Sequence, residues 1–348
     1  MSSPLLKSVS PVVAGSSESA DSKTGPAAPA GAAFSDDVRR GLRESPKCLP
    51  PRCLYDELGS LLFEAICRLP WYGVTRAETA LLRDRRRELS SLANPQSIVE
   101  LGPGGGEKLA LVAAACPRLK RVHLVDISER ALDDSAAAVA VARPRAQIIR
   151  HATTFEHGLR QALNRHAKRP TLVMLLGSTI GNYEPEDAAR LMQSMSASLG
   201  PNDTFLLGAD LVKPERDFLL AYDDPLGVTA SFNKNVLVRI NSEMGADFDL
   251  GAFTHRAVWN ASASRIEMHL VSRRAQAVRV GRMTVRFKKN ETIRTENSYK
   301  YQPESLRLLA AATDFDAVGQ WLDHDFGYAL TMFRRRPLRR GSRSTDHG

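Results

Sequence analysis

Apolar residues near the start of the chain recur at the spacing of helices. One run places large side chains at Tyr55, Leu58, Leu62, Phe63, Ile66 and Leu69, and Pro70 ends it. A second amphipathic pattern predicts a helix over residues 77–92. Residues 1–36, by contrast, are rich in Ala, Ser, Gly and Pro. We expect that segment to be disordered, because it cannot bury enough apolar surface to offset its ordering entropy.

Apolar strands and helices then alternate along the chain. Short apolar runs predict strands at 97–101, 122–125, 147–150, 171–176 and 204–208. Helices are predicted after the glycines that end at residue 106, over 129–142 with Ser128 as N-cap, and over 185–199. This alternation predicts an α/β fold built on a doubly wound, Rossmann-like parallel sheet.

The alternation stops at residue 213. Residues 213–299 contain a helix, an Asn-rich stretch and alternating patterns that predict strands at 257–260, 265–270 and 284–287. A helix over 303–312 and strands near 318–322 and 328–333 follow. We therefore predict an inserted α+β domain at the carboxyl edge of the sheet, where open α/β sheets bind their ligands.

A glycine-rich turn marks a candidate nucleotide site. Gly102 and Gly104 to Gly106 join the first sheet strand to the next helix, and Asp126 ends the following strand. Glycine lets a ligand approach the backbone, and a carboxylate at this place can accept hydrogen bonds from ribose hydroxyls. Nicotinamide and S-adenosylmethionine proteins both use this pair. The spacing departs from G-x-G-x-x-G, and the leading Glu-Leu-Gly favours S-adenosylmethionine.

Composition indicates an ordinary globular protein. Hydrophobic residues make up 43% of the 348 residues and charged residues 25%. No apolar run approaches the ~20 residues that cross a bilayer, and the N-terminus does not have the pattern of a secretory signal. Four cysteines occur without a CxxC pair or ligand-spaced histidines. We expect a cytoplasmic protein with reduced thiols, no metal site and no membrane partner.

Much of the net charge of +9 lies at the C-terminus. Residues 334–348 contain six arginines and one aspartate. A basic tail of this kind is typical of a solvated, disordered end, and no aromatic residues interleave with its arginines as in a single-strand reader. We therefore do not expect a nucleic-acid partner, and we expect a monomer.

Short sequence blocks between residues 46 and 333 narrow the interpretation. They include Tyr-Asp-Glu-Leu-Gly-Ser (55–60), Arg-Leu-Pro-Trp-Tyr (68–72), Leu-Gly-Ser-Thr-Ile-Gly-Asn (176–182), Gly-Val-Thr-Ala-Ser-Phe-Asn (227–233), Gly-Ala-Asp-Phe-Asp (245–249) and Thr-Glu-Asn-Ser (295–298). In these blocks, taken in order, the chain resembles the histidine-specific N-α-methyltransferases of ergothioneine biosynthesis. The resemblance implies a methyltransferase domain over 77–212 plus 300–333 and a substrate-binding domain over 37–76 plus 213–299.

The resemblance also implies two sets of site residues. The residues expected to contact S-adenosylmethionine are Gly102, Lys108 and Asp126, with Thr154 and Phe155 beside the adenine. The residues expected to hold the amino acid are Tyr72, Asn182, Tyr222, Glu296 and Ser298, with Met268 lining the imidazole pocket and Phe63 and Thr229 close by. Tyr72 and Glu296 are the expected catalytic pair.

These residue types suit the chemistry. Methyl transfer from a sulfonium needs a neutral, well-aligned amine more than a strong acid or base, so positioning should dominate. Asn182 and the Tyr222 phenol can donate to the substrate carboxylate. Glu296 can accept an imidazole N–H, and Ser298 can donate or accept. Their two-residue spacing puts both side chains on one face of a strand.

Each assignment has a structural alternative. Glu296 alone would read as a solvated strand carboxylate, Asn182 as a turn former and Lys108 as a solvent-facing lysine. Tyr72 and Tyr222 would read as core aromatics whose hydroxyls are satisfied, and Met268 as plain core. The group that removes the amine proton stays open among a tyrosine, a water and bulk solvent.

Three positions depart from the family pattern. The glycine loop reads Gly-Pro-Gly-Gly-Gly-Glu-Lys rather than Gly-Ser-Gly-Thr-Ser-Glu-Lys, although Lys108 stays in register. Thr154 replaces the usual aspartate and would accept more weakly from the adenine amine. Asn297 replaces an apolar residue between Glu296 and Ser298, and it would shift specificity unless it faces away from the ligand.

The expected function is three successive methylations of the α-amine of free histidine, which give hercynine. One alternative is an N-α-methyltransferase for another amino acid, such as tryptophan or tyrosine. A second is a relative that binds S-adenosylmethionine but is catalytically impaired, as the altered loop and Thr154 would suggest. A third is a nucleic-acid methyltransferase recruited by the basic tail.

Overall fold

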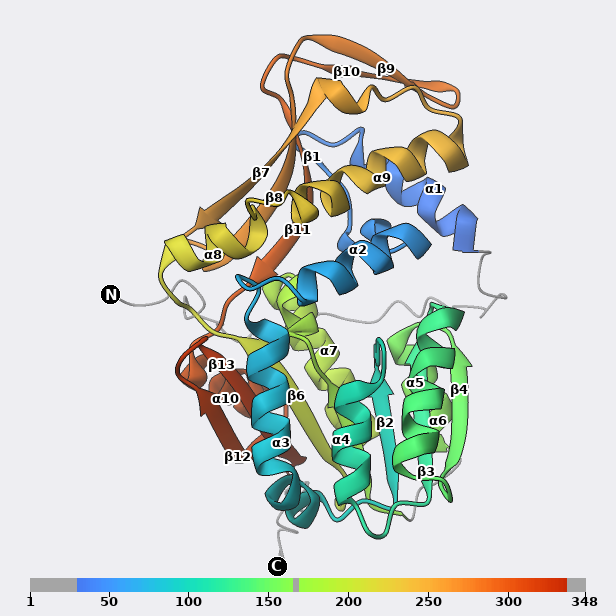
Figure 1. The fold of residues 1–348 in the computed structure, drawn as a ribbon, viewed down its shortest axis with the longest axis vertical. Helices are drawn as coiled ribbons and strands as arrows, with labels where there is room; N and C mark the ends of the chain where they lie inside the picture. Colours follow the sequence, from blue (N-terminus) through green and yellow to red (C-terminus); the bar gives the residue numbers. More distant parts are fainter. Residues whose placement is uncertain (1–29, 165–168, 337–348) are drawn as a thin grey trace, which may run out of the picture. The chain divides into compact units, whose positions relative to one another are not determined.

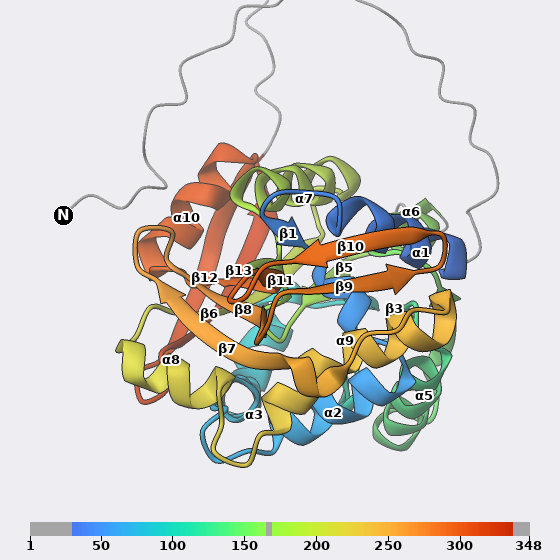
Figure 2. The same ribbon diagram turned by 90° about the horizontal axis from the view of Figure 1, so that it is seen from above.

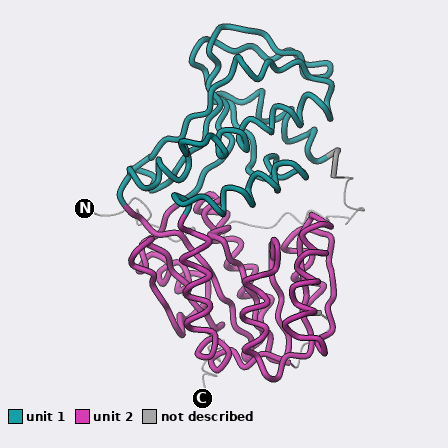
Figure 3. The backbone as a smooth tube through the Cα atoms, viewed as in Figure 1, with its two compact units in different colours: residues 1–72, 214–299 teal, residues 73–213, 300–348 magenta. Residues whose placement is uncertain are grey.

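The chain divides into two compact units, seen in a computed structural model that describes residues 30–164 and 169–336 (Figure 3). Unit 1 comprises residues 1–72 and 214–299, and unit 2 comprises residues 73–213 and 300–348. The chain thus passes between units after residues 72, 213 and 299. The sequence pattern had placed the corresponding boundaries after residues 76, 212 and 299.

Unit 2 contains a seven-stranded sheet in the order β12-β13-β6-β5-β2-β3-β4. Its parallel strands are β2 (Ser97–Leu101), β3 (Arg121–Asp126), β4 (Gln147–Ala152), β5 (Thr171–Leu175) and β6 (Thr204–Asp210). An antiparallel pair, β13 (Tyr328–Arg335) and β12 (Phe315–Asp323), extends the sheet beyond β6. The predicted α/β class and doubly wound sheet are confirmed.

Helices cover both faces of this sheet (Figure 1). One face carries α3 (Val74–Ala93), α4 (Glu107–Ala115) and α5 (Glu129–Ala142). The other face carries α6 (Phe155–Asn164), α7 (Pro185–Ser198) and α10 (Pro303–Ala312). Every residue of β2, β5 and β6 is buried, as expected for strands that are sandwiched between helical layers.

The strand order creates a switch point between β2 and β5. From β2 the chain proceeds through β3 to β4 on one side, and from β5 to β6 on the other. At such a point the loops that follow the two strands leave in opposite directions, and a crevice opens at their carboxyl ends. The glycine loop 102–106 and the loop that begins at Gly177 both lie there.

Unit 1 contains a four-stranded sheet in the order β1-β11-β8-β7 and a separate hairpin of β9 and β10 (Figure 2). The strands are β1 (Lys47–Cys48), β7 (Phe253–Asn260), β8 (Arg265–Ser272), β9 (Gln276–Val280), β10 (Met283–Phe287) and β11 (Thr292–Tyr299). The helices are α1 (Ala30–Gly41), α2 (Glu57–Cys67), α8 (Glu215–Tyr222) and α9 (Val228–Met244). Helix α9 packs against α2, β7 and β8. The short 3-10 turns are η2 (Pro51–Leu54), η3 (Thr179–Asn182) in unit 2, and η4 (Leu250–Ala252).

Two segments predicted to be disordered are partly regular. Residues 30–36 belong to α1, where Phe34 is buried and the Arg239 guanidinium stacks 3.9 Å from its ring centroid. At the other end, Arg334 and Arg335 lie in β13. Composition alone suggested that the entropy cost of ordering these segments would exceed the gain from burial. Burial of an aromatic ring and pairing within a sheet offset that cost. Residues 1–29 and 337–348 lie outside the described residues.

Helix α9 was the largest element that the pattern missed. Its sequence was described only as an Asn-rich stretch, with no helix assigned to it, and asparagine has a low helix propensity. In the structure the Asn235 amide donates to Asp56 Oδ1 at 2.7 Å, and Asn233 is fully buried in a hydrogen-bond network. Tertiary hydrogen bonds therefore outweigh the local preference. Helix α6 and strand β9 were likewise not predicted. Within the described ranges, no helix combines the length and apolarity that a membrane crossing needs.

Candidate active site

The glycine loop of unit 2 adopts a conformation that few other residues could follow. Gly102, Gly104 and Gly106 have φ of 73°, 56° and 76°. A Cβ on Gly104 or Gly105 would meet no atom within 4 Å, so this stretch of backbone borders open space. A Cβ on Gly106 would lie 2.4 Å from Ser135 Cα, because the first turn of α4 packs directly on α5. The loop is thus fixed at one end and open in the middle, as a ligand cradle requires.

A buried carboxylate lies directly before this loop. Glu100 in β2 is 1% exposed, and its Oε2 atom has no hydrogen-bond partner among the described residues. Burial raises its pKa to about 8, against the lowering effect of the Lys108 ammonium. At neutral pH the free protein therefore holds Glu100 mainly as the neutral acid, and a ligand that brings a cationic donor would favour its ionised form. The sulfonium nucleoside implied by the sequence carries an amino-acid ammonium of that kind.

Lys108 is held by a second buried acid. Its ammonium lies 2.6 Å from Oε2 of Glu78, which is fully buried in α3. Glu78 also accepts hydrogen bonds from the Gly177 backbone N–H at 2.8 Å and from the Tyr328 hydroxyl. Glu78 therefore ties the β2 and β5 sides of the switch point together through Lys108 and Gly177. Sequence reasoning assigned no role to Glu78 or Glu100, although Glu100 lies within the Val-Glu-Leu-Gly motif.

The remaining predicted cofactor residues lie at or just after the carboxyl ends of the strands in unit 2. Asp126 ends β3, accepts a hydrogen bond from the Ser128 N–H at 2.9 Å, and has its pKa raised by burial. Phe155 begins α6, and a Cβ placed on Gly102 would lie 3.3 Å from its ring. Thr154 is exposed and its carbonyl accepts the Gly158 N–H at 2.9 Å. The strand ends therefore bring Gly102, Asp126 and Phe155 to one edge of the sheet.

A β-bulge decides where Glu296 points in unit 1. The pairing of β11 with β8 shifts between Arg294 and Glu296, which leaves Thr295 as the extra residue. Ile293 before the shift pairs with Leu270, while Glu296 after it pairs with Met268. Because Leu270 and Met268 share the buried face of β8, the bulge brings Glu296 onto the buried face as well. Strict alternation from Ile293 would have turned Glu296 to the opposite face.

On that face of β11 and β8, polar side chains lie next to aromatic side chains. Ser298 pairs with Ile266 on the buried face, and its Oγ lies 3.0 Å from the Tyr222 hydroxyl. The Tyr222 and Tyr72 rings meet edge to face, with centroids 6.3 Å apart. Glu296 is 8% exposed and Met268 1%. Unit 1 therefore brings together Tyr72, Tyr222, Met268, Glu296 and Ser298, five of the six predicted substrate residues.

The sixth residue, Asn182, belongs to unit 2. It ends the 3-10 turn η3, in the loop that follows β5, and it is half-buried. Ser178 at the start of that turn has φ of 62°, and its hydroxyl accepts the Asp210 N–H at 2.9 Å. Asn182 thus lies at the carboxyl edge of the unit 2 sheet.

Tyr55 is a site residue that sequence reasoning missed. Its ring packs edge to face on Phe63 and Phe232, with centroids 5.6 Å and 5.5 Å away. Burial, and then the nearby Glu296 carboxylate, raise the pKa of Tyr55 well above its usual value. Its phenol therefore stays protonated, and it lies near enough to the Glu296 carboxylate to feel its charge. The Tyr-Asp-Glu-Leu-Gly-Ser block contained this residue, but the helical spacing there suggested only a core position.

Asn297 lies on the opposite face of β11. It pairs with Glu267, whereas Glu296 and Ser298 pair with Met268 and Ile266. The departure from the family pattern at position 297 is therefore directed away from the predicted pocket.

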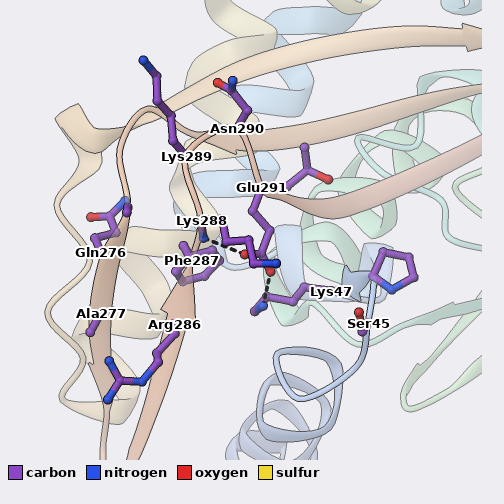
Figure 4. Close-up of a pocket in the computed structure, with 13 residues that line it drawn as sticks. Ser45, Lys47, Gln276, Ala277, Arg286, Phe287, Lys288, Lys289, Asn290 and Glu291 are labelled. Atoms are coloured by element: carbon purple, nitrogen blue, oxygen red, sulfur yellow. Dashed lines mark hydrogen bonds and ion pairs between the residues drawn. The ribbon is translucent and has the colours of Figure 1, made fainter.

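A large surface hollow in unit 1 contains none of the predicted residues (Figure 4). It measures about 1170 Å³ and is lined by residues 45–47, 275–277 and 286–292. Figure 4 shows the Lys47 ammonium and the Lys288 backbone N–H on the Glu291 carboxylate. The hollow is wide and polar, and it lies at the Thr292 end of β11, six residues before Ser298. The buried polar side chains of Glu296 and Ser298 are the better chemical candidate for binding an amino acid.

Comparisons with known proteins identify relatives that match most of the chain. A histidine N-alpha-methyltransferase of Mycolicibacterium smegmatis is 41% identical over 303 residues, which cover 85% of this chain and 94% of that protein. One of Mycobacterium tuberculosis is 40% identical over 301 residues, covering 84% and 93%. A 4-dimethylallyltryptophan N-methyltransferase of Claviceps purpurea is 26% identical over 324 residues, covering 85% and 93%.

The family assignment rests on the whole folded region. The sequence model described as "Histidine-specific methyltransferase, SAM-dependent" matches residues 34–335. That range begins in α1 and ends with β13, so it includes both units. The chain therefore belongs to the histidine-specific, S-adenosylmethionine-dependent methyltransferase family.

Proposed function

We propose that the protein methylates the α-amine of free L-histidine three times and so makes hercynine, the first step of an ergothioneine-type pathway. The observation that carries this proposal is the Glu296 carboxylate, which is buried on the same face as Ser298 and Met268. A carboxylate on this face can accept a hydrogen bond from an imidazole N–H. The identities to two histidine N-alpha-methyltransferases support the same substrate.

The residues of unit 2 suit S-adenosylmethionine. When bound, this cofactor supplies a methyl group activated by a sulfonium. We assign the glycine loop to its backbone contacts, Asp126 to its ribose hydroxyls and Phe155 to a face of its adenine. Glu100 would accept from its ammonium, and Lys108, held by Glu78, would face its carboxylate. Thr154 is assigned beside the adenine amine by family resemblance.

The residues of unit 1 suit histidine. Glu296 would accept one imidazole N–H, Ser298 would satisfy the other nitrogen, and Met268 would pack on the ring. Tyr222 would donate to the substrate carboxylate, and Tyr72 would align the α-amine. Asn182 is assigned to the substrate carboxylate by family resemblance alone. Phe63 and Thr229 are assigned to the edge of this pocket by family resemblance, and Tyr55 is assigned to it because it lies near Glu296.

In this proposal the protein acts mainly by alignment. The lone pair of a neutral amine must point along the axis of the bond that breaks, and holding that geometry supplies much of the rate. Because imidazole is anchored at one end and the carboxylate at the other, the amine keeps one position through successive transfers. The tyrosine hydroxyls would hold the α-amine through neutral hydrogen bonds, without placing another charged group beside the sulfonium.

Mass spectrometry of the purified protein with S-adenosylmethionine and each of the twenty amino acids tests the proposal. The expected result is histidine carrying up to three added methyl groups, with little product from the others. Unmodified histidine, in a protein that binds S-adenosylhomocysteine by calorimetry, would remove histidine as the substrate. No heat with S-adenosylhomocysteine would instead indicate an impaired cofactor site.

A second candidate is an N-α-methyltransferase for an aromatic amino acid. It is favoured by the aromatic wall of Tyr55, Phe63, Tyr72 and Phe232, and by the identity to a 4-dimethylallyltryptophan N-methyltransferase. The higher identity to the two histidine N-alpha-methyltransferases, 41% and 40% against 26%, weighs against it. The same amino-acid screen separates the two candidates.

A further inference from the structure

A series of buried hydrogen bonds links Thr295, the residue before Glu296, to the backbone of Tyr222. The Thr295 hydroxyl donates to Asn233 Oδ1 at 2.6 Å, and the Asn233 amide lies 2.8 Å from His255 Nδ1. His255 Nε2 in turn lies 2.8 Å from the Tyr222 backbone oxygen. The series therefore leads from the bulge next to Glu296 to Tyr222, whose hydroxyl returns to Ser298 at 3.0 Å. Helix α9, through Asn233, joins the two ends.

The directions of these hydrogen bonds agree with one another. The backbone carbonyl oxygen of Tyr222 can only accept a hydrogen bond, so His255 Nε2 carries the proton. His255 Nδ1 can then accept a hydrogen bond from the Asn233 amide. That amide also donates to the His269 oxygen at 3.2 Å, which leaves Oδ1 for Thr295. Burial lowers the pKa of His255 and so favours this neutral form. Each hydrogen bond therefore has one donor and one acceptor, and exchanging donor and acceptor in one bond would break the next.

This arrangement costs more than an apolar core would. Asn233 and Thr295 are fully buried and His255 is 7% exposed. Buried polar groups in a partly satisfied network are destabilising, whereas a fully satisfied network fixes one geometry. The geometry fixed here is the bulge, because Thr295 is the extra residue and also reaches the Met268 oxygen at 3.1 Å. Without the bulge, Glu296 would face the other side of the sheet.

We propose that Thr295, Asn233 and His255 are positioning residues that set imidazole recognition, because they lock the bulge that presents Glu296 and anchor the segment that carries Tyr222. The inference rests on the proposed function, since it supposes that Glu296 meets the substrate. None of the three residues needs to touch the substrate. Their effect is on where Glu296 and the Tyr222–Ser298 pair lie.

The first test compares Thr295→Val with Thr295→Ser. Valine keeps the shape of threonine but removes the hydroxyl, which leaves Asn233 Oδ1 unsatisfied, whereas serine keeps the hydroxyl. We expect Thr295→Val to lower kcat/KM for histidine at least about tenfold, mainly through KM. Thr295→Ser should recover most of that loss. Both variants should bind S-adenosylhomocysteine with a Kd within about twofold of the parent, because the assigned cofactor residues belong to unit 2.

A second variant keeps the inference testable if Thr295→Val does not fold. In Asn233→Asp one carboxylate oxygen can still accept from Thr295, but the other faces the lone pair of His255 Nδ1. Protonation of His255 would turn that clash into an ion pair. The other charged groups around His255 are Asp223, 3.8 Å away, with Asp224 and Lys234. The ratio of variant to parent kcat/KM should therefore rise as the pH falls from about 9 to 6.

The outcomes separate this inference from the proposed function. A parent protein that leaves histidine unmethylated overturns the proposed function and, with it, the inference. A parent that methylates histidine, with a folded Thr295→Val variant that matches Thr295→Ser in KM, overturns the inference alone. If Thr295→Val does not fold, a ratio for Asn233→Asp that is flat across this pH range overturns it.

Discussion

Two carboxylates stand out at the scale of single residues, and each is buried for a different reason. Glu296 is turned inward by a bulge beside tyrosines that can donate to it or to a ligand. Glu100 is buried in β2 directly before the glycine loop, with one oxygen unsatisfied among the described residues. Acidic side chains are rarely fully buried in proteins unless they are paired or take part in binding or catalysis. Both residues are therefore candidates for contact with a charged or polar ligand.

Replacing Glu296 should separate substrate recognition from cofactor binding. We expect Glu296→Ala to lower kcat/KM for histidine by about 10²-fold, the loss expected for a hydrogen bond to a charged group that is buried. Calorimetry should show an unchanged Kd for S-adenosylhomocysteine. The matched control is Glu291→Ala, which removes a carboxylate just before the same strand and should leave the kinetics unchanged. Equal histidine kinetics in the two variants would refute the role of Glu296.

Glu100 should give the free protein a measurable pH dependence of stability. Its pKa of about 8 in the folded chain exceeds the usual 4.5, so the folded state holds this proton where the unfolded state has lost it. The stabilisation is complete below pH 4.5 and is lost as the pH rises through about 8. Glu100→Gln cannot titrate. We expect its Tm, relative to the parent's, to rise between about pH 5 and 8 and then level off. Parallel Tm curves across that range would contradict the assignment.

At the scale of elements, the glycine loop depends on close packing as well as on backbone freedom. We expect Gly106→Ala to destabilise the protein by about 1–3 kcal/mol, because its φ is 76° and a Cβ would strike the Ser135 backbone. Gly105→Ala is the matched control, since a Cβ there meets nothing within 4 Å. Urea unfolding of both variants, without cofactor, measures the difference. A Gly106→Ala variant as stable as Gly105→Ala would show that the loop can relax.

The parallel core was the part of the fold that sequence patterns described well. Runs such as 97–101 and 171–175 are continuously apolar because helices cover both faces, and that pattern is visible in the sequence. Helix α9 was hidden, because its buried asparagines resemble a loop until their partners at the N-cap of α2 and on the sheet are known. The bulge at Thr295 was hidden for a similar reason. It depends on the register of β8 against β11, which no local pattern contains.

At the scale of the whole molecule, the basic C-terminus divides into a structured and an undescribed part. Arg334 donates to the Leu92 carbonyl and Arg335 to the Leu199 carbonyl, while Arg336 pairs with Asp316 at 2.7 Å. These three arginines therefore anchor the last strand. They account for three of the six arginines in residues 334–348, so at least half of these arginines contact the folded protein.

Two truncations should separate the two parts of this tail. Removing residues 337–348 should leave histidine turnover within about twofold, because no assigned site residue lies there. Removing residues 334–348 should lower Tm by a few degrees, because it also removes the three arginine contacts. Thermal denaturation and histidine kinetics of both truncations measure these effects. Loss of histidine turnover in the shorter truncation would revive a role for the tail in the reaction.

The sequence by itself determined the α/β class, the place of the glycine loop and the family, because these depend on local periodicity, on the residue types that a tight turn tolerates, and on ordered motif blocks. The predicted site residues follow from that resemblance. Tertiary structure alone decided which face Glu296 occupies, that Asn297 points away from it, and that Tyr55 and Glu100 belong to the candidate sites. The physical reason is that strand register, burial and long-range hydrogen bonds arise between segments far apart in the chain, as between Asn233 and Thr295.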